Sequence, residues 1–508
     1  MKTQSAPITG KNLGKGKMKY FFAVDLGATS GRTIVGTLDD GVLKTLELTR
    51  FENRLMQVGE YVYWDLFALY EEVVRGLSLA AEKGMDICSV GVDTWGVDFV
   101  CVGADGGILR NPLSYRDAHS FQAMEQYFKK ALSREELYQR TGIQFVNYNS
   151  LFQLYGMRQR EDSALNAAKK ILFMPDAVSY LLTGETVCEY SIASTSQLLD
   201  AKSHTLDSKV LETLSLTSDN FGRLVFPGTV VGHLTSDVQK RTGLGPVPVV
   251  AVAGHDTASA VAAVPARNAH FAYLSSGTWS LIGIESQESI VGKESFEANF
   301  TNEGGVDGTI RFLKNICGLW LYECCRKELV EVRDKSHASL QSESLGAEPF
   351  RSLINPDDPC FANPDSMVEA IQYYCRIHGE LIPETPAQIF RCIFESLALR
   401  YREVFESLKK MTPFPIEVLH IIGGGSMNNI LNQFTANSLG IRVLAGPQEC
   451  TALGNLMMQA KALGIVSDIW EMRHVISRNV SPRVFEPLDI DLWDKAYEKY
   501  LEITRASL

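Results

Sequence analysis

The strongest constraint on the fold of this chain is a motif that occurs once in each half: a short apolar strand, a turn of small residues and a return strand. In the first half the strands are predicted at residues 20–26 and 33–38, and in the second half at 271–275 and 279–284. The turns between them contain Gly, Ser, Thr and Ala, which favour a hairpin. A hairpin that recurs in this way predicts a duplicated core with a cleft between the two halves.

Between and after the hairpins, strands alternate with helical patterns, which is typical of α/β proteins. Asp65 is placed to cap the first long helix, and further helices are predicted at 387–410, 428–439 and 452–463. Further strands are predicted at 87–92, 97–102, 416–422 and 442–445.

The length of 508 residues alone suggests about three domains at ~150 residues each, but the pattern favours two. We expect domains at 19–264 and 265–508, with the join near Pro265. A basic tail at 1–18 is expected to be disordered.

The charge balance excludes some classes of partner. With 49 Lys and Arg against 60 Asp and Glu, the net charge is −11, which argues against nucleic acid or an anionic membrane surface as the main partner. No apolar run reaches the roughly 18 residues that a membrane span needs. We expect a cytoplasmic protein whose ten cysteines stay reduced. Neither a GxxxxGK[ST] phosphate loop nor a GxGxxG loop after a strand occurs.

The turn of the first hairpin carries residue types that suit a phosphate group. Residues 25–32 read Asp-Leu-Gly-Ala-Thr-Ser-Gly-Arg, so an acid ends the strand and two glycines and two hydroxyl side chains follow. Backbone N–H groups of such a turn can surround a phosphate, while Asp25 can hold a hydrated Mg²⁺ and Arg32 supplies a fixed positive fork. The alternative is a plain hairpin turn with an exposed arginine.

Two more turns have the same character. Residues 275–278 (Ser-Ser-Gly-Thr) form the second hairpin turn and are a second candidate for phosphate contact, the alternative being a simple β-turn. Residues 423–425 are three consecutive glycines at a strand end, where a flat ligand such as a purine can approach the backbone closely. The alternative for these glycines is a tight turn from strand to helix.

The most plausible reactive centre is Gly-His-Asp-Thr at residues 254–257, which follows an apolar strand. A carboxylate between a strand and a helix can accept a proton from a substrate hydroxyl, which makes Asp256 a candidate general base. The alternative is that Asp256 only caps a helix that begins at Thr257. His255 is either a hydrogen-bonded structural residue or a substrate contact.

Three polar patches lie among apolar residues, at 93–96, 115–117 and 314–315. Recognition of a polyol needs converging donors and acceptors beside an aromatic wall, and these residue types suit that task. The alternatives are a turn for the first patch, a surface ion pair for the second and a helix start for the third.

Taken in this order, the motifs resemble the FGGY carbohydrate kinases of the actin/hexokinase/Hsp70 superfamily. The likeness runs from about residue 23 to residue 455. The stretches that carry it are 92–99, 141–145, 174–176, 255–261, 273–281, 302–305 and 313–316.

This resemblance implies an α/β fold with two ribonuclease H-like domains of the actin/hexokinase type and a catalytic cleft between them. It implies that the first domain binds the sugar and phosphate and the second binds the nucleotide. The implied activity is transfer from ATP, with Mg²⁺, to the 1-hydroxyl of L-rhamnulose, giving L-rhamnulose 1-phosphate and ADP in L-rhamnose catabolism. The alternatives are another ketose, such as L-fuculose or L-xylulose, or a non-enzymic ATP-binding module. The oligomeric state, monomer or homodimer, stays open.

The resemblance also implies roles for individual residues. Asp256 is the implied catalytic base, and Asp25 the implied partner of Mg²⁺ through water. The residues implied to contact ATP are Ala28, Thr29, Ser30, Gly31, Arg32, Thr278, Glu323 and Gly424. The residues implied to contact the sugar are Gly96, His255, Asp256, Thr257 and Asn315. Glu323 stands where the family pattern leads us to expect a neutral Gln, and an acid there repels phosphates.

Overall fold

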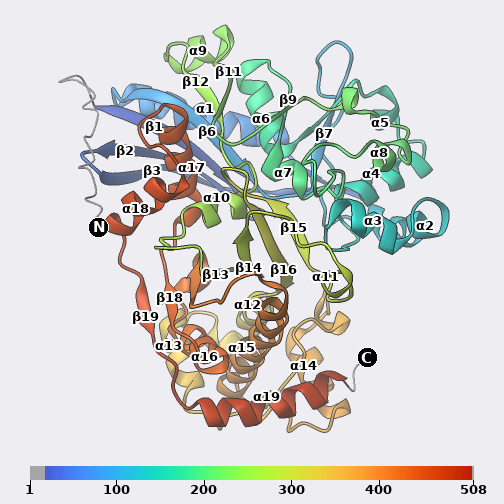
Figure 1. Cartoon of the computed structure of the whole chain (residues 1–508), viewed down its shortest axis with the longest axis vertical. Coiled ribbons are helices and arrows are strands. Elements are labelled where there is room, and N and C mark those ends of the chain that lie inside the picture. The colour runs from blue at the N-terminus through green and yellow to red at the C-terminus, as the bar shows by residue number, and fades with distance from the viewer. Residues whose placement is uncertain (1–17, 506–508) are drawn as a thin grey trace, which may run out of the picture.

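The structure is a computed structural model that describes residues 18–505, so the predicted tail lies outside the described residues except for Met18. Two sheets form its framework (Figure 1). The six strands of the first sheet, in the order β11-β12-β6-β1-β2-β3, are β1 Lys19–Leu26, β2 Ser30–Asp39, β3 Val42–Glu52, β6 Asp86–Thr94, β11 Thr229–His233 and β12 Pro248–Ala251. The seven strands of the second sheet, in the order β15-β16-β14-β13-β17-β18-β19, are β13 Phe271–Ser276, β14 Trp279–Ser286, β15 Thr301–Gly304, β16 Ile310–Cys317, β17 Val418–Ile422, β18 Val443–Ala445 and β19 Arg483–Phe485.

Both predicted hairpins are present, and they occupy equivalent places in the two sheets. β1 pairs antiparallel with β2 and parallel with β6. In the same way, β13 pairs antiparallel with β14 and parallel with β17. This shared topology confirms a duplicated α/β core. The remaining strands form small two-stranded sheets: β4 Leu55–Val58, β5 Tyr61–Trp64, β7 Phe99–Val102, β8 Lys170–Phe173, β9 Val187–Glu189 and β10 Arg223–Val225.

The helices and sheets alternate in layers. The helices of the first half are α1 Leu66–Glu82, α2 Ala123–Lys130, α3 Arg134–Thr141, α4 Ser150–Gln159, α5 Ser163–Ala167, α6 Met174–Thr183, α7 Tyr190–Ser194, α8 Ser208–Glu212, α9 Ser236–Thr242 and α10 Asp256–Ala262. The helices of the second half are α11 Lys293–Glu297, α12 Trp320–Glu328, α13 His337–Ser344, α14 Met367–Ile377, α15 Pro386–Met411, α16 Asn429–Leu439, α17 Cys450–Ala462, α18 Ile469–Asn479 and α19 Ile490–Arg505.

Apolar clusters show which helices cover which sheet. Helices α1, α6 and α9 cover the outer face of the first sheet, and α10, α17 and α18 fill the space between the two sheets. Helices α12 to α16 and α19 cover the outer face of the second sheet. A separate lobe, built from α2 to α5, α7 and α8 around β7 and β8, stands beside the first sheet (Figure 1).

Helix α17 comes from the second half of the chain but packs on the first sheet. Its Asn455 Nδ2 donates to Asp93 Oδ2 at 2.6 Å, and Gln459 Nε2 donates to the carbonyl of Phe22 at 3.0 Å. Gln459 also accepts a hydrogen bond from Ser89 Oγ at 2.7 Å. The predicted domain boundary near Pro265 lies between α10 and β13. Because α17 follows this boundary in the chain but packs on the first sheet, the boundary stays a prediction.

Several predicted elements agree closely with the structure. The side chain of Asp65 accepts a hydrogen bond from the N–H of Ala68 and caps α1, as expected. The helices predicted at 387–410, 428–439 and 452–463 correspond to α15, α16 and α17. Among the described helices, none is long and apolar enough to cross a membrane.

One predicted strand and three of the alternative interpretations were wrong. The strand predicted at 97–102 begins only at Phe99, because Val97 has a positive φ of 69° and the chain bends there. Asp93 and Thr94 do not form a turn but complete β6. Residues 314–315 lie within β16, so they do not begin a helix, and the helix expected at Thr257 starts one residue earlier, with His255 as its N-cap residue.

Candidate active site

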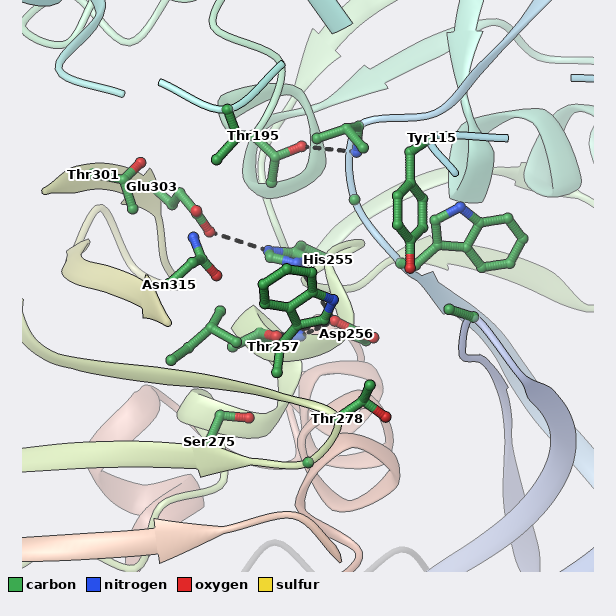
Figure 2. Close-up of a pocket in the computed structure, with 18 of the residues that line it drawn as sticks. Tyr115, Thr195, His255, Asp256, Thr257, Ser275, Thr278, Thr301, Glu303 and Asn315 are labelled. Atoms are coloured by element: carbon green, nitrogen blue, oxygen red, sulfur yellow. Dashed lines mark hydrogen bonds and ion pairs between the residues drawn. The ribbon is translucent and has the colours of Figure 1, made fainter. Parts of the chain in front are cut away.

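A cavity of about 350 Å³ opens between the two halves, and both contribute to its walls (Figure 2). Some of the implied site residues lie on the walls: Ala28, Gly96, His255, Asp256, Thr257, Thr278, Asn315 and Gly424. Others do not reach the cavity: Asp25, Thr29, Ser30, Gly31, Arg32 and Glu323. Residues that we had not named as contacts also line the cavity, among them Gln144, Tyr148, Asn149, Thr195, Thr301 and Glu303.

Asp256 lies at the junction of strand and helix, as its sequence context indicates. The N–H of Thr94 at the end of β6 donates to the carbonyl of Gly254 at 2.9 Å, which ties this junction to the first sheet. Asp256 Oδ1 accepts from the N–H of Thr257 at 2.5 Å and from its hydroxyl at 3.1 Å. Its side chain is 30% exposed, so the carboxylate remains accessible to a ligand in the cavity.

A buried carboxylate from β9 holds the chain that leads into Asp256. Glu189 Oε2 accepts from the N–H of Gly254 at 3.0 Å and from Ser191 Oγ at 2.7 Å. Ser191 Oγ in turn accepts from the N–H of His255 at 3.3 Å. Two consecutive N–H groups before Asp256 are therefore bound by this pair, which sequence reasoning missed because no local motif marks Glu189.

The carboxyl of Asp176 lies behind Glu189 and accepts its backbone N–H at 3.2 Å. Burial raises the pKa of Asp176 well above its usual range, and the nearby Glu189 charge adds to the shift. Burial also raises the pKa of Glu189, while the N–H donors around it act in the opposite direction. The Met-Pro-Asp stretch at 174–176 therefore contacts Glu189, which holds the chain before Asp256, and it does not line the cavity.

His255 connects Asp256 to a buried ion pair on the second sheet. Its Nε2 lies 3.4 Å from Asp256 Oδ1, and its Nδ1 lies 3.0 Å from Arg311 Nη2 and 3.3 Å from Glu303 Oε2 (Figure 2). Glu303 and Arg311 are cross-strand partners on β15 and β16, with Nη2 3.0 Å from Oε2. Burial alone raises the pKa of Glu303, but Arg311 and His255 outweigh it, so this pKa lies below its ordinary value.

Two acids end neighbouring strands beneath the first hairpin. Asp25 and Asp93 are register partners on β1 and β6. Burial raises the pKa of Asp25 despite two hydrogen bonds from Arg32, whose Nε and Nη2 both donate to Asp25 Oδ2, at 2.9 and 2.7 Å. Arg32 also pairs with Glu449 of the second half. The pKa of Asp93 lies well above its usual range, because burial raises it most and the charge of Asp25 adds to the shift. The Oδ1 atom of Asp93 is buried without a hydrogen-bond partner.

This pair of acids fits an ion that keeps its water shell better than one bound directly. In the described part of the chain, no group of three or more Asp, Glu, His or Cys side chains could hold a metal. Mg²⁺ gives up its water reluctantly and is commonly held by one or two carboxylates together with substrate phosphates. The partnerless Asp93 Oδ1 and the carboxylate of Asp25 suit that second arrangement.

The two glycine-containing turns of the second half are in close contact. Gly423 has φ +80°, and a Cβ there would lie 3.0 Å from the carbonyl of Ser276. A Cβ on Gly425 would lie 2.0 Å from the hydroxyl of Ser276, so a side chain is excluded at that position. The turn at 276–278 and the start of the 3₁₀ helix η5 Gly424–Met427 therefore face the cavity together.

Glu323 lies elsewhere, on the first turn of α12. Its carboxylate lies 3.6 Å from Arg326 Nη1 and 4.0 Å from His337 Nδ1. The acid therefore pairs with Arg326 of its own helix and lies away from the cavity walls.

The part of the cavity wall that contains Trp95 and Tyr115 is aromatic and polar. Trp95 and Tyr115 lie on this wall, and both are held by the buried carboxylate of Asp98. Asp98 Oδ2 accepts from Trp95 Nε1 at 3.0 Å and from the N–H of Tyr115 at 3.1 Å. Gln144 Oε1 accepts from the N–H and the Nδ2 of Asn315, at 3.0 and 3.2 Å. Aromatic faces beside amides and hydroxyls are the lining that a sugar needs.

The second and third polar patches contribute only in part. Tyr115 and Asn315 face the cavity, but Asp117 is buried and accepts from the N–H groups of Val62 and His119, so it is not part of a surface ion pair. Lys314 donates to the carbonyl of Ala298 instead of reaching the cavity.

Solved structures share this α/β fold with its two sheets. Xylulose kinase from Lactobacillus acidophilus superposes with a TM-score of 0.81 at 16% identity, over 96% of this chain and 98% of that one. Glycerol kinase from Plasmodium falciparum, solved with ADP, superposes with a TM-score of 0.79 at 14% identity, over 97% and 99% of the two chains.

Sequence comparison gives the family. Residues 20–263 match the N-terminal domain of the FGGY family of carbohydrate kinases, and residues 272–463 match its C-terminal domain. The chain belongs to the FGGY family of carbohydrate kinases. It is 56% identical to a rhamnulokinase of Bacteroides thetaiotaomicron over 96% of this chain and 99% of that one. It is 41% identical to a rhamnulokinase of Bacillus subtilis over 93% and 96%.

Proposed function

We propose that this chain transfers the γ-phosphoryl group of ATP to the 1-hydroxyl of L-rhamnulose, giving L-rhamnulose 1-phosphate and ADP. The observation that carries the proposal is Asp256, a half-buried carboxylate that faces one cavity together with the two glycine turns and a sugar-type wall. The relatives named rhamnulokinase, which match nearly the whole chain, support L-rhamnulose as the acceptor.

In the proposed reaction the oxygen of the 1-hydroxyl attacks the γ-phosphorus of ATP, and Asp256 accepts the proton of that hydroxyl. At the same time the bond between the γ-phosphorus and the oxygen that bridges it to the β-phosphate breaks. Catalysis of this kind consists mainly of positioning and charge stabilisation. Thr278, Gly424 and the backbone of residues 28–31 are proposed to contact the nucleotide.

Mg²⁺ bound together with ATP would offset charge on the phosphates. Asp25 and Asp93 are the side chains proposed to hold its water shell, and Arg32 lies beside Asp25. We assign Glu323 no contact to the phosphates, because it pairs with Arg326 of its own helix and lies outside the cavity.

The substitution Asp256→Asn tests the base. The amide has nearly the same shape but cannot accept the proton, so kcat should fall by about 10³-fold or more, while calorimetry should still detect ATP binding. Glu185, an exposed acid, offers a matched control as Glu185→Gln, which should leave kcat unchanged. Retention of more than about a tenth of the wild-type kcat by Asp256→Asn would sink the assignment.

The acceptor is tested by a coupled assay over L-rhamnulose, L-fuculose and L-xylulose. L-Rhamnulose should have the highest kcat/KM, because a hydroxyl of opposite configuration leaves a buried polar partner unpaired. If another ketose is better, the chemistry stands and the named substrate fails. If ATP binds and no ketose is phosphorylated, a non-enzymic ATP-binding module becomes the better description.

A further inference from the structure

Arg311 is fully buried beside the catalytic junction, although neither the sequence motifs nor the proposed mechanism uses it. Its side chain is 0% exposed, and its Nε donates to the carbonyl of Gly304 at 2.9 Å. Its Nη2 lies 3.0 Å from Glu303 Oε2 and 3.0 Å from His255 Nδ1. An arginine in this position reaches from the second sheet to the residue next to the proposed base.

The contact with Arg311 decides which nitrogen of His255 carries the hydrogen. A guanidinium only donates and keeps its protons at all ordinary pH values. A hydrogen on His255 Nδ1 would face the guanidinium hydrogens across 3.0 Å, whereas a lone pair there accepts from them. Glu303 Oε2 is already an acceptor for Arg311, so it does not need a hydrogen from Nδ1. Of the two neutral tautomers, this contact therefore favours the one with its hydrogen on Nε2.

The Nε2–H of His255 faces the ligand space. Nε2 lies 3.4 Å from Asp256 Oδ1, and His255 lines the cavity beside the carboxylate. In Figure 2 the ring lies between Glu303 on one side and Asp256 on the other. A sugar hydroxyl that donates to Asp256 brings the neighbouring oxygen of the sugar next to this N–H.

We propose that Arg311 is a positioning residue that holds His255 in the Nε2–H tautomer, so that His255 donates a hydrogen bond to the sugar oxygen adjacent to the reacting hydroxyl. The inference rests on the proposed function for the identity of the sugar. Its core, the tautomer set by Arg311, does not depend on that function. Asp256 and His255 then divide the work: one accepts from the reacting hydroxyl and the other donates to its neighbour.

The first test observes the ring directly. The chain has nine histidines, so ¹⁵N-histidine labelling with long-range ¹H–¹⁵N correlation is practicable, and His255→Gln identifies the signal of His255. The expected result is a protonated Nε2 and an unprotonated Nδ1 in the wild type. Protonation at Nδ1 in the wild type would overturn the proposal, whatever the activity of the protein.

The second test changes the donor. In Arg311→Met, Nδ1 loses its donor and can give a hydrogen to Glu303 instead, so the ring should change to the Nδ1–H tautomer. We expect kcat/KM for the ketose to fall about 10- to 100-fold, with ATP affinity changed less than about twofold. The double variant Arg311→Met/Glu303→Gln removes the unpaired buried charge and provides an amide donor for Nδ1, so it should restore the Nε2–H signal and part of the activity.

A matched control separates the tautomer from the loss of a buried ion pair. Arg391 and Glu395 form such a pair at 2.7 Å on α15, away from the cavity. Arg391→Met/Glu395→Gln should leave the His255 signal and kcat/KM unchanged. If Arg311→Met keeps the Nε2–H signal, or if the double variant recovers neither the signal nor activity while folded, the role assigned to Arg311 is wrong. Failure of every ketose assay with a normal tautomer signal would instead count against the proposed function.

Discussion

The position of Asp256 depends on hydrogen bonds from residues far away in the chain. Glu189 accepts from the N–H of Gly254, and Ser191 accepts from the N–H of His255, so the two residues before the proposed base are tied to the end of β9 and the start of α7. All of these groups are buried, where a donor without an acceptor costs about 1–3 kcal/mol. The junction therefore has one favourable backbone arrangement.

This predicts that Glu189→Gln lowers kcat. The NH₂ group of the new glutamine side chain is a donor and cannot accept from the N–H and O–H donors that surround Glu189. The backbone before Asp256 should therefore shift and move the Asp256 carboxylate. We expect kcat to fall about tenfold or more, with ATP affinity close to that of the wild type by calorimetry. Glu185→Gln, at an exposed position a few residues earlier, is the control. Unchanged kcat in Glu189→Gln would contradict the positioning role.

A buried histidine should make the fold sensitive to acid. His420 is 2% exposed in β17, its ring lies edge-on to Phe271 and its Nδ1 has no partner. Burial lowers the pKa of His420 to about 4, and Arg473 adds to the shift. Between pH 6.5 and 4 the unfolded chain binds a proton that the folded chain does not, so stability falls as the pH falls through this window.

The expected size is up to about 3 kcal/mol at pH 4, from ~1.4 kcal/mol per pKa unit. His420→Leu removes the group, so its urea midpoint should fall less between pH 7 and pH 4.5 than that of the wild type. His233→Gln, at an exposed position, should behave like the wild type. Parallel pH profiles for His420→Leu and the wild type would rule this explanation out.

At the scale of the elements, helices α10 and α17 pack closely against each other. A Cβ on Gly454 of α17 would lie 1.8 Å from the carbonyl oxygen of Ser259 on α10. That neighbour is helix backbone, which cannot move aside as a side chain can. These two helices fill the space between the sheets, so their separation also sets the spacing of the two halves.

Gly454→Ala should therefore destabilise the protein even though alanine favours helices. We expect a loss of roughly 1–3 kcal/mol or more from overpacking, seen as a lower midpoint of thermal unfolding. Gly245→Ala is the control, because a Cβ at Gly245 meets nothing within 4 Å. If Gly454→Ala unfolds at the same temperature as the wild type, α10 and α17 can move apart without loss of stability, and this prediction is wrong.

Local sequence patterns predicted the elements well where the pattern was long or the turn chemistry clear. The hairpins and α15 follow from alternation and from helical periodicity, which act over a few residues. The strand expected at 97–102 failed because Val97 adopts a positive φ, which nothing in its side chain indicates. The helix start expected at Thr257 failed by one residue, which is the usual uncertainty at helix ends.

For the molecule as a whole, the cavity walls come from both halves, so catalysis should involve their relative movement. Closure around both substrates would exclude the water that competes with the sugar as acceptor. The net charge of −11 opposes a polyanion at long range, so we expect ATP binding to depend on local groups such as the N–H groups of the turns.

We therefore expect the radius of gyration measured by X-ray scattering to fall when a non-hydrolysable ATP analogue and the ketose are added together. Either ligand alone should produce a smaller change, because it fills only part of the cavity between the halves. Identical scattering curves with and without both ligands would show that the halves do not move.

The sequence by itself determined the duplicated α/β core, the three small-residue turns and Asp256 at a junction of strand and helix. These features depend on periodicity and turn chemistry within short segments, so each can be predicted from a short stretch of sequence. Tertiary structure decided which other side chains join the site. Glu189, Gln144, Arg311 and Glu303 enter through strand register and packing between segments far apart in the chain, and Glu323 is left outside. Such meetings depend on long-range pairing, which no single stretch of sequence encodes.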